Sequence, residues 1–213
     1  MKSKVVSLIL YVVVFGFSSE AQKSTQYNLI QLLQEHKLVT YPHQETQALD
    51  DPDKSAITSK GIVWLEGVNF SEGKIDIDLR GKDIFLKSFL GIAFHGVDTI
   101  TYEVIYFRPF NFRHTDTARR KWSVQYMSMP KYNYAVLRKE HPQMYENAVT
   151  PVPKADEWFH ATIVVNKNQI IVYVNHSAEP SLRVSKLNDR VDGKIGLWSD
   201  ELSGDFANLT ITQ

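Results

Sequence analysis

Residues 73–81 read GKIDIDLRG, and their apolar and charged side chains alternate from Lys74 to Arg80. A β-strand places successive side chains on opposite faces, so Ile75, Ile77 and Leu79 face one way and the charged side chains face the other. Such a strand has one face suited to burial and one face suited to solvent. This pattern is typical of an antiparallel sheet that packs on one side and is solvated on the other.

Similar runs recur from Gly61 to the end of the chain. They are rich in β-branched and aromatic residues, and most are bounded by Gly, Asn, Asp or Pro, as strands are. The further runs are GIVWLEG (61–67), SFLGIAFHG (88–96), TYEVIYFRP (101–109), KWSVQYMS (121–128), WFHATIVVN (158–166), QIIVYVN (169–175), SLRVSKL (181–187), GKIGLWS (193–199) and DFANLTI (205–211). About ten short strands with few helices indicate an all-β fold, a two-sheet antiparallel jelly-roll β-sandwich.

Two stretches depart from the strand pattern and predict short helical insertions. Residues 24–39 place Leu29, Ile30, Leu32 and Leu33 on one apolar side. Residues 132–149 hold the other candidate helix, and Pro142 limits its length.

Several segments together resemble a bacterial group of concanavalin A-like jelly-roll domains. They are FSEGKIDIDLRG (70–81), SFLGIAFHG (88–96), YEVIYFRPFNFR (102–113), RRKWSVQYMSMPKY (119–132), EWFHATIVVN (157–166) and GKIGLWSDELSGDFANLTI (193–211). That group is related to the 3-keto-disaccharide hydrolase family and, more loosely, to glycoside hydrolase family sixteen. The resemblance implies two curved sheets, with a concave face on which relatives bind or cleave glycans.

The sequence lacks the catalytic motif of family sixteen. Retaining enzymes of that family carry Glu-x-Asp-x-x-Glu on one strand, which places two carboxylates about 5 Å apart. Here EGKIDIDLR (72–80) holds Glu72, Asp76 and Asp78 but no second glutamate. The resemblance therefore supports the fold more than that mechanism.

The first residues have the layout of an export signal. Lys2 and Lys4 precede an apolar run, and a small residue at Ala21 suits cleavage after that position. The run is about 13 residues long, shorter than the roughly 20 residues of a spanning helix, so we expect no transmembrane anchor in the mature chain. The expected divisions are a signal peptide (1–21), an N-terminal segment packing on the sandwich (22–60) and the concanavalin A-like sandwich (61–213).

Composition narrows the compartment and the partners. The chain has no cysteine, which excludes disulfides and thiolate chemistry and suits a bacterial periplasm or exterior. Its formal net charge of +0 provides no global attraction to nucleic acid, so we expect a carbohydrate partner and no nucleic acid. No cofactor is predicted. Asp200, Glu201 and Asp205 indicate either a solvated turn or a calcium loop.

Strand alternation assigns candidate site residues to the open face of a sheet. With Val104 and Tyr106 in the core, Glu103 faces the groove, and the same logic places His95 and Gln125 there. A carboxylate near an imidazole can act as acid and base, or it can hold sugar hydroxyls. Glu103 and His95 are therefore candidate catalytic residues and Gln125 a candidate ligand-binding residue. The alternative is that all three are solvent-facing sheet residues without a ligand.

The stretch TYEVIYFRPFNFRHTD (101–116) joins an apolar strand directly to a polar, cationic segment. We expect Pro109 to end the strand, because proline lacks the N–H that a central ladder needs. Arg108 should then hold the loop by hydrogen bonds, while Asn111 and Arg113 point toward a ligand at the rim of the groove.

Further cations and aromatic residues follow this stretch. Guanidinium groups pair with carboxylate, sulfate or phosphate, so Arg119 favours an acidic sugar as ligand, whereas a solvated charged loop is the alternative. Tyr132 and Tyr134 are candidate platforms for sugar rings. The tryptophans lie in predicted strands, so we expect them in the core rather than in such platforms.

Two functions fit these features, and a third remains open. The first is an exported glycan-binding module, motivated by the missing pair of glutamates. The second is a hydrolase or lyase that acts on glycosides, including 3-keto-glycosides, through Glu103 and His95. The third is a structural or partner-binding protein of the cell envelope.

Overall fold

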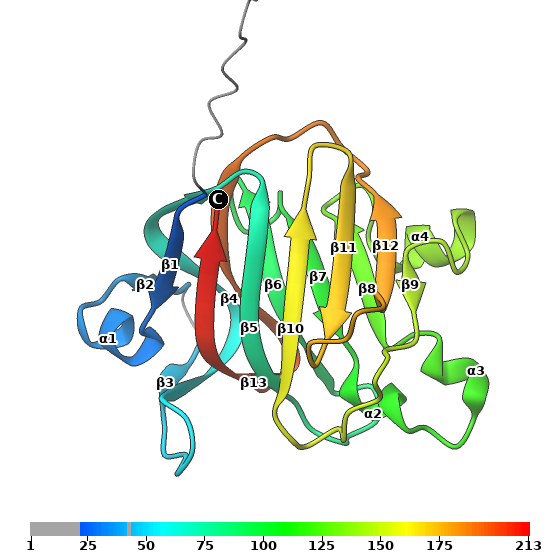
Figure 1. Ribbon diagram of the computed structural model, residues 1–213, viewed down its shortest axis with the longest axis horizontal. Coiled ribbons are helices and arrows are strands. Elements are labelled where there is room, and N and C mark those ends of the chain that lie inside the picture. Colours follow the sequence, from blue (N-terminus) through cyan, green and yellow to red (C-terminus); the bar gives the residue numbers. More distant parts are fainter. Residues whose placement is uncertain (1–21, 42–43) are drawn as a thin grey trace, which may run out of the picture.

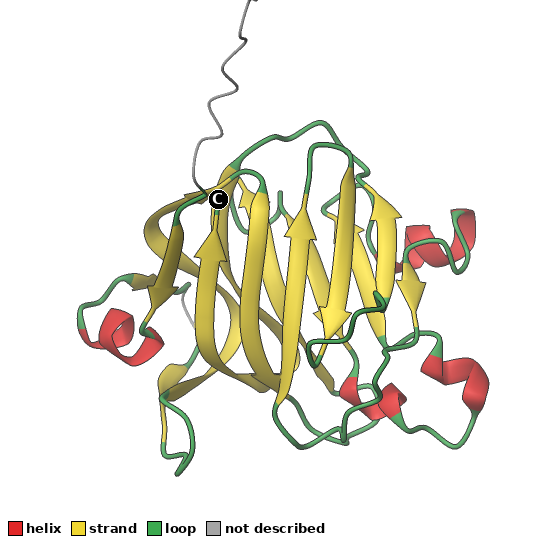
Figure 2. Cartoon of the chain, viewed as in Figure 1, coloured by secondary structure: helices red, strands yellow, loops and turns green. Residues whose placement is uncertain are grey.

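A computed structural model describes residues 22–41 and 44–213 of the chain, so the predicted signal peptide lies outside the described residues. The chain folds into a two-sheet antiparallel jelly-roll β-sandwich, as the strand pattern predicted. Figures 1 and 2 show two layers of strands, with short helices at the margins.

The front sheet faces the viewer in Figure 1. Its strands lie in the order β12–β11–β10–β5–β13–β1, and the second half of β13 takes part. Their bounds are β1 (Ser24–Tyr27), β5 (Gly73–Arg80), β10 (Phe159–Val165), β11 (Gln169–Val174), β12 (Leu182–Ser185) and β13 (Gly193–Thr212).

The back sheet lies behind it, in the order β9–β8–β7–β6–β13–β4–β2. Here the first half of β13 takes part, and β3 pairs with the first residues of β4. The bounds are β2 (Leu38–Val39), β3 (Thr46–Leu49), β4 (Ala56–Phe70), β6 (Ser88–Gly96), β7 (Glu103–Phe107), β8 (Val124–Ser128) and β9 (Glu146–Asn147).

The long strand β13 connects the two sheets. It pairs with β6 as far as Glu201 and with β5 from Asp205 onward. Its partner β4 follows it across the same corner, with a register shift between Ser199 and Gly204. One continuous hydrogen-bonded network therefore runs through both layers.

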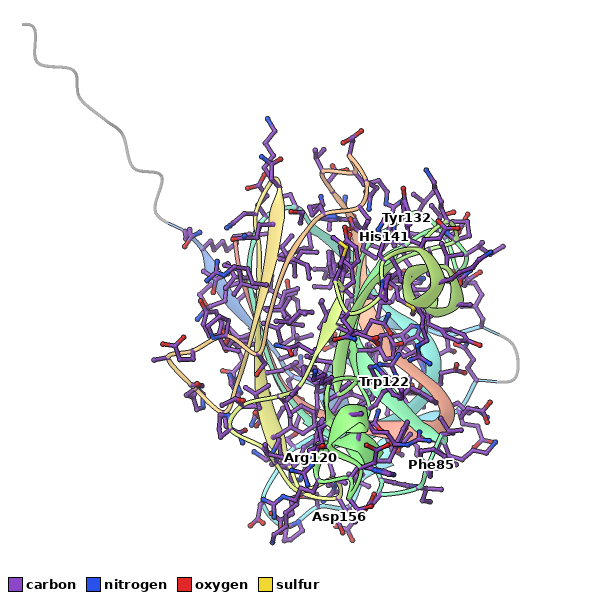
Figure 3. All side chains as sticks on the ribbon, turned by 90° about the vertical axis from the view of Figure 1, so that its right-hand side faces the viewer. Phe85, Arg120, Trp122, Tyr132, His141 and Asp156 are labelled. Carbon is purple, nitrogen blue, oxygen red and sulfur yellow. The ribbon has the colours of Figure 1, made fainter. Side chains whose placement is uncertain are left out.

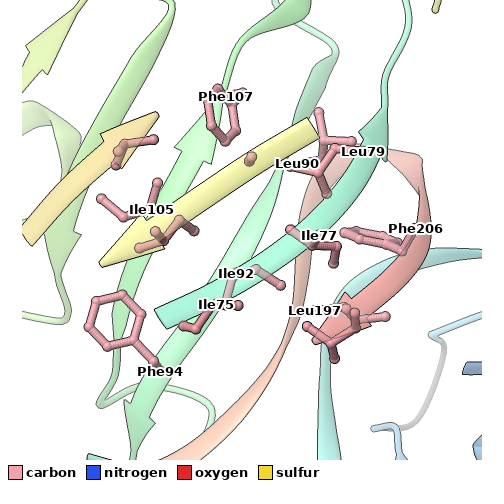
Figure 4. Close-up of a cluster of buried hydrophobic side chains, with 14 of the residues drawn as sticks. Ile75, Ile77, Leu79, Leu90, Ile92, Phe94, Ile105, Phe107, Leu197 and Phe206 are labelled. Atoms are coloured by element: carbon pink, nitrogen blue, oxygen red, sulfur yellow. The ribbon is translucent and has the colours of Figure 1, made fainter. Parts of the chain in front are cut away.

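The core lies between the two sheets (Figure 4). Ile75, Ile77 and Leu79 of β5 point into it and are fully buried, as their alternation predicted. Ile105 and Phe107 of β7 meet them from the back sheet.

A second apolar cluster covers the outer face of the back sheet. Val104, Tyr106, Met127 and Trp198 belong to it. The prediction that Val104 and Tyr106 face the core between the sheets is therefore wrong. Because both faces of β7 are apolar, its sequence is an almost unbroken apolar run that does not show which side faces inward.

Both predicted helices are present, and each begins at an asparagine. Asn28 caps α1 (Leu29–Gln34), and Asn133 caps α4 (Tyr134–Glu140), each accepting hydrogen bonds from backbone N–H groups of the first turn. The structure adds two short helices that the pattern did not predict, α2 (Pro109–Phe112) and α3 (Thr117–Arg120). Strands β1, β2 and β3 were also not predicted.

Candidate functional site

A cleft with a volume of ≈ 730 Å³ opens on the outer face of the back sheet. Strands β6, β7, β8 and the first half of β13 supply its floor, and α2, α3 and α4 supply walls. Figure 3 looks toward this edge of the sandwich, with Trp122 between α3 and α4 in the view. The lining residues are Leu86, Phe89, Tyr102, Tyr106, Arg108, Phe110, Asn111, Arg119, Trp122, Met127, Met129, Asn133, Tyr134, Ala135, Arg138, Trp198, Asp200 and Glu201.

Aromatic rings form much of the floor. The rings of Tyr106 and Trp198 lie 5.2 Å apart between centroids, and Phe89 lies 6.2 Å from Tyr106. Trp198 was expected in the core; it is buried, but on the cleft side of the sheet. The floor therefore offers an apolar surface of packed aromatic rings that are tilted by about 53–54° to one another.

Arg108 is the buried cation of the floor, only 5% exposed. Its guanidinium donates to the carbonyl of Trp122 at 2.8 Å, to the hydroxyl of Tyr106 and to Oε1 of Gln125. The Tyr106 hydroxyl donates to the same Gln125 oxygen at 2.6 Å. Burial raises the pKa of Tyr106 to about 12, so this hydroxyl stays neutral at physiological pH.

Gln125 lies on the cleft side of β8, as predicted, but it is only 2% exposed. Its carbonyl oxygen is occupied by Arg108 and Tyr106. Its role as a ligand-binding residue stays a prediction, and its position fits that of a residue that orients Arg108.

The residues after β7 follow part of the sequence-based prediction. The strand ends at Phe107, and Pro109 takes the first position of α2, where its missing N–H costs no hydrogen bond. Arg108 bonds the carbonyl of Trp122 as expected, but it also lines the cleft. Its position in the lining of the cleft was not predicted.

Asn111 is buried at 2% exposure and lines the cleft. Its side-chain amide donates to the carbonyl of Trp122 at 3.1 Å, while its Oδ1 has no hydrogen-bond partner among the described residues. A buried acceptor without a partner is costly, so a ligand donor there would be favoured. Its predicted ligand-binding role remains consistent with this position.

Trp122 forms the wall between α3 and α4, rather than part of the core as expected. The guanidinium of Arg138 lies 4.7 Å from its ring centroid, and that of Arg119 lies 5.9 Å away. Arg119, predicted to bind ligand, thus stands at the cleft wall. Tyr134 lines the same side and is 58% exposed.

The side of the cleft at β13 carries carboxylates. Asp200 and Glu201 line it and are exposed. Glu201 pairs with Lys87 at 2.7 Å, whereas Asp205 pairs with Arg80 instead of joining them. The described residues contain no group of three or more His, Asp or Glu side chains arranged to hold a metal ion.

His95 and Glu103 do not lie on the open face, so the prediction of a catalytic pair there is wrong. Both side chains are fully buried between the sheets. His95 Nδ1 lies 2.7 Å from Glu103 Oε1, and its Nε2 donates to the carbonyl of Ser71 at 2.7 Å. Tyr126 donates to the other carboxylate oxygen.

A β-bulge explains the inward position of His95. Gly196 of β13 pairs with Ala93 of β6, while Lys194 pairs with Gly96, so β6 carries one extra residue. His95 has a positive φ of 49° at this point. The extra residue breaks the alternation on which the prediction depended. Glu103 has a different cause: the prediction assigned the two faces of β7 the wrong way round, and Glu103 points inward with Ile105 and Phe107.

Arg113 and Tyr132 are not in the cleft either. Arg113 donates to the carbonyls of Pro153 and Val152 at 3.1 and 3.2 Å and lines a smaller pocket of ≈ 410 Å³. Tyr132 packs beside the outer apolar cluster, 6.2 Å from the ring of His141. Sequence reasoning missed Trp122 and Arg138, although the helix signal of residues 132–149 could have directed attention to Arg138.

No known family model matches the sequence, and no curated protein matches it. Solved structures do resemble the fold. A carbohydrate-binding module, CBM66, from Bacillus subtilis shares 13% identity, with 79% of this chain and 94% of that chain covered and a TM-score of 0.52. A protein of unknown function with a galectin-like fold, also from Bacillus subtilis, shares 12% identity over 91% and 98%, with a TM-score of 0.57.

A proposed glycosyl hydrolase from Parabacteroides distasonis has a TM-score of 0.58, with 14% identity over 88% of this chain and 98% of that chain. At such low identity these likenesses show the fold and not the activity. No helix among the described residues is both long enough and apolar enough to cross a membrane.

Proposed function

We propose that this protein is an exported glycan-binding module that holds a sugar in the cleft on the outer face of the back sheet. The observation that carries the proposal is the cleft itself, an aromatic floor beside buried polar groups. Its volume of ≈ 730 Å³ falls within the range of about 300–1,000 Å³ of typical ligand pockets.

The chemistry of the lining suits a sugar ring. A pyranose has apolar C–H faces and a polar edge of hydroxyl groups. The rings of Trp122, Tyr134 and Trp198 offer flat surfaces for the faces. The Oδ1 of Asn111, which has no hydrogen-bond partner within residues 22–41 and 44–213, offers an acceptor for a hydroxyl.

Two further observations support the proposal. A carbohydrate-binding module is among the structural neighbours. The first 21 residues have the pattern of an export signal, which supports a location in the periplasm or outside a bacterial cell.

Isothermal titration of the mature chain against a panel of neutral and acidic oligosaccharides tests the proposal. At least one oligosaccharide should bind, and Trp122→Ala and Tyr134→Ala should each weaken binding by about tenfold or more, because each removes a stacking surface. Tyr173→Ala is the matched control, because Tyr173 lies on β11 in the front sheet, far from the cleft walls.

The panel also defines the failure of the proposal. A folded protein that binds no oligosaccharide would contradict it. Equal losses in the Tyr134→Ala and Tyr173→Ala variants would show that the sugar binds elsewhere.

A hydrolase or lyase on the same scaffold is the second candidate. Asp200 favours it, because this exposed carboxylate lines the cleft and makes no ion pair among the described residues. A general base needs such an accessible carboxylate. The wild type should then release product from 3-keto-glycosides or uronate oligosaccharides, and Asp200→Asn should abolish this release. Binding without turnover would instead support the non-catalytic glycan-binding module.

A further inference from the structure

We infer that the cleft selects a glycan that carries an anionic substituent, a carboxylate or a sulfate, and that this anion docks between Arg119 and Arg138 beside Trp122. The inference rests on the proposed function and names the class of its ligand.

Two arginines of the cleft, Arg108 on the floor and Arg138 on the wall, share a single buried carboxylate. Arg108 NH1 lies 3.5 Å from Oε2 of Glu146, and Arg138 NH2 lies 3.7 Å from the same oxygen. Glu146 is 6% exposed, and this oxygen accepts no hydrogen bond among the described residues. One carboxylate therefore serves two guanidinium groups, one of which is buried.

The other partners of Arg108 are neutral. They are the carbonyl of Trp122, the hydroxyl of Tyr106 and the amide of Gln125. The raised pKa of Tyr106, which follows from its burial, keeps that hydroxyl from supplying a negative charge. Two guanidinium groups thus share one carboxylate, and about one positive charge remains uncompensated on this side of the cleft, where the half-exposed guanidinium of Arg138 can pair with an anionic ligand.

The guanidinium of Arg138 lies 4.7 Å from the ring centroid of Trp122, and that of Arg119 lies 4.8 Å from the centroid of Phe85 and 5.9 Å from that of Trp122. The side chain of Arg119 is 35% exposed. Its Nε lies 3.7 Å from Oδ2 of Asp116, whose side chain is also exposed. The side chain of Arg138 is 46% exposed. Stacking on an aromatic ring restrains a guanidinium without using its N–H groups, and the planar fork then pairs well with a carboxylate or sulfate.

The carboxylates of the cleft lie on the other side of the floor. Asp200 and Glu201 belong to β13, which is separated from β8 by β6 and β7. Three strand spacings correspond to about 14 Å, because neighbouring strands lie about 4.8 Å apart. Because Glu201 is paired with Lys87, Asp200 is the carboxylate that repels an anionic ligand group from the β13 side, while Arg119 and Arg138 attract it to the α3–α4 side, which fixes the direction of the glycan in the cleft.

Matched pairs of oligosaccharides test the inference. One pair is a uronate oligosaccharide and its carboxyl-reduced form, and the other is a sulfated oligosaccharide and its desulfated form. In titration calorimetry at low salt, the anionic member of at least one pair should bind about tenfold or more tightly, as expected for a charge-assisted hydrogen bond. The pair that shows the preference identifies the carboxylate or the sulfate as the recognised group.

Variants then locate the anion. Arg138→Gln and Arg119→Gln should each lower affinity for the anionic member about tenfold more than affinity for the neutral member. Arg120→Gln is the matched control, because this neighbouring arginine is exposed, bonds the carbonyl of His114 and does not line the cleft. Melting curves check that each variant is folded.

The outcomes separate the inference from the proposed function. Neutral and anionic members that bind equally, with Trp122→Ala abolishing both, would overturn the anionic selectivity and keep glycan binding. An anionic preference that survives both arginine variants would overturn the docking position. A folded protein that binds neither member of either pair would contradict the proposed function itself.

Discussion

His95 Nδ1 lies 2.7 Å from Glu103 Oε1 in the interior of the sandwich, and neither side chain is exposed to solvent. Both ring nitrogens of His95 face oxygen acceptors, a carboxylate and the carbonyl of Ser71, so the imidazole donates from both. Burial alone would raise the pKa of Glu103, but the hydrogen bonds from His95 and Tyr126 outweigh it and lower this pKa. The two side chains form a buried hydrogen-bonded pair that belongs to the scaffold.

Glu103→Gln should therefore destabilise the protein without changing glycan affinity. The substitution removes a buried carboxylate that bonds His95 and Tyr126 and lies 3.8 Å from Nζ of Lys186, and the loss of one partner of such a buried group costs about 3–5 kcal/mol of unfolding free energy. Urea denaturation measures the loss, and Glu66→Gln, at an exposed position on β4, is the control. Unchanged stability combined with lost glycan binding would return Glu103 to the list of site residues.

Arg113→Ala should have little effect on glycan binding. Arg113 donates to the carbonyls of Val152 and Pro153 and does not line the main cleft. Removing these exposed bonds should lower the unfolding free energy by about 0.5–1.5 kcal/mol. A loss of glycan affinity of about tenfold would place the ligand at the smaller pocket beside Arg113 instead.

Tyr106→Phe should lower the stability of the protein. The hydroxyl bridges Arg108 and Gln125, so its removal leaves Arg108 with one fewer partner in a buried position. We expect a loss of about 1–3 kcal/mol in unfolding free energy. Thermal unfolding measures the loss; a variant as stable as the wild type would show that the bridge contributes nothing.

Stability should fall as the pH rises from about 6.5 to about 9. On the outer face of the front sheet, His160 Nδ1 lies 2.7 Å from Asp78 Oδ1, and its Nε2 lies 3.4 Å from Asp76 Oδ1. The hydrogen bonds with Asp76 and Asp78 raise the pKa of His160 from 6.5 to about 9. A raised pKa means that the stabilisation is complete below the unfolded value and is lost as the pH passes the folded value.

The lowered pKa of Asp78 sets the lower pH limit of this stabilisation. Burial tends to raise the pKa of Asp78, but hydrogen bonds from His160, Lys54 and Asn208 lower it from 3.8 to about 2. This contribution is present above pH 3.8 and is lost toward pH 2. The pair of His160 and Asp78 should therefore stabilise the protein most between the two unperturbed pKa values, 3.8 for the aspartate and 6.5 for the histidine.

Melting temperatures across this pH range check the prediction. His160→Gln should flatten the alkaline decline. His176→Gln is the control, because His176 stacks on His160 at 4.2 Å without bonding either aspartate. Parallel declines in the wild type and His160→Gln would exclude His160 as the titrating group.

The sequence predicted the sandwich because strands such as β5 alternate cleanly. It could not assign the faces of β7, since the outer cluster of Val104, Tyr106 and Met127 makes the back sheet apolar on both sides. The bulge at His95 was also invisible, because it depends on pairing with β13 far along the chain. Local spacing cannot report such long-range pairing.

The walls of the cleft were partly predictable. Asn111, Arg119 and Tyr134 were identified from residue type beside a strand end or an irregular segment, and all three line the cleft. Arg113 was not separable from them by sequence, because only the fold shows that its guanidinium bonds residues 152–153. Trp122 was assigned to the core because its position just before β8 resembles a buried strand residue.

The passage of β4 and β13 through both sheets has a consequence for how the molecule opens. Neither layer can separate without breaking hydrogen bonds in the other, so amide protons of both sheets should exchange with solvent as one slow group. The short helices α3 and α4 stand outside that ladder and should exchange faster, through local opening. Residues on these helices can therefore diverge among descendants of this protein, and recognition can change, while the scaffold keeps its stability.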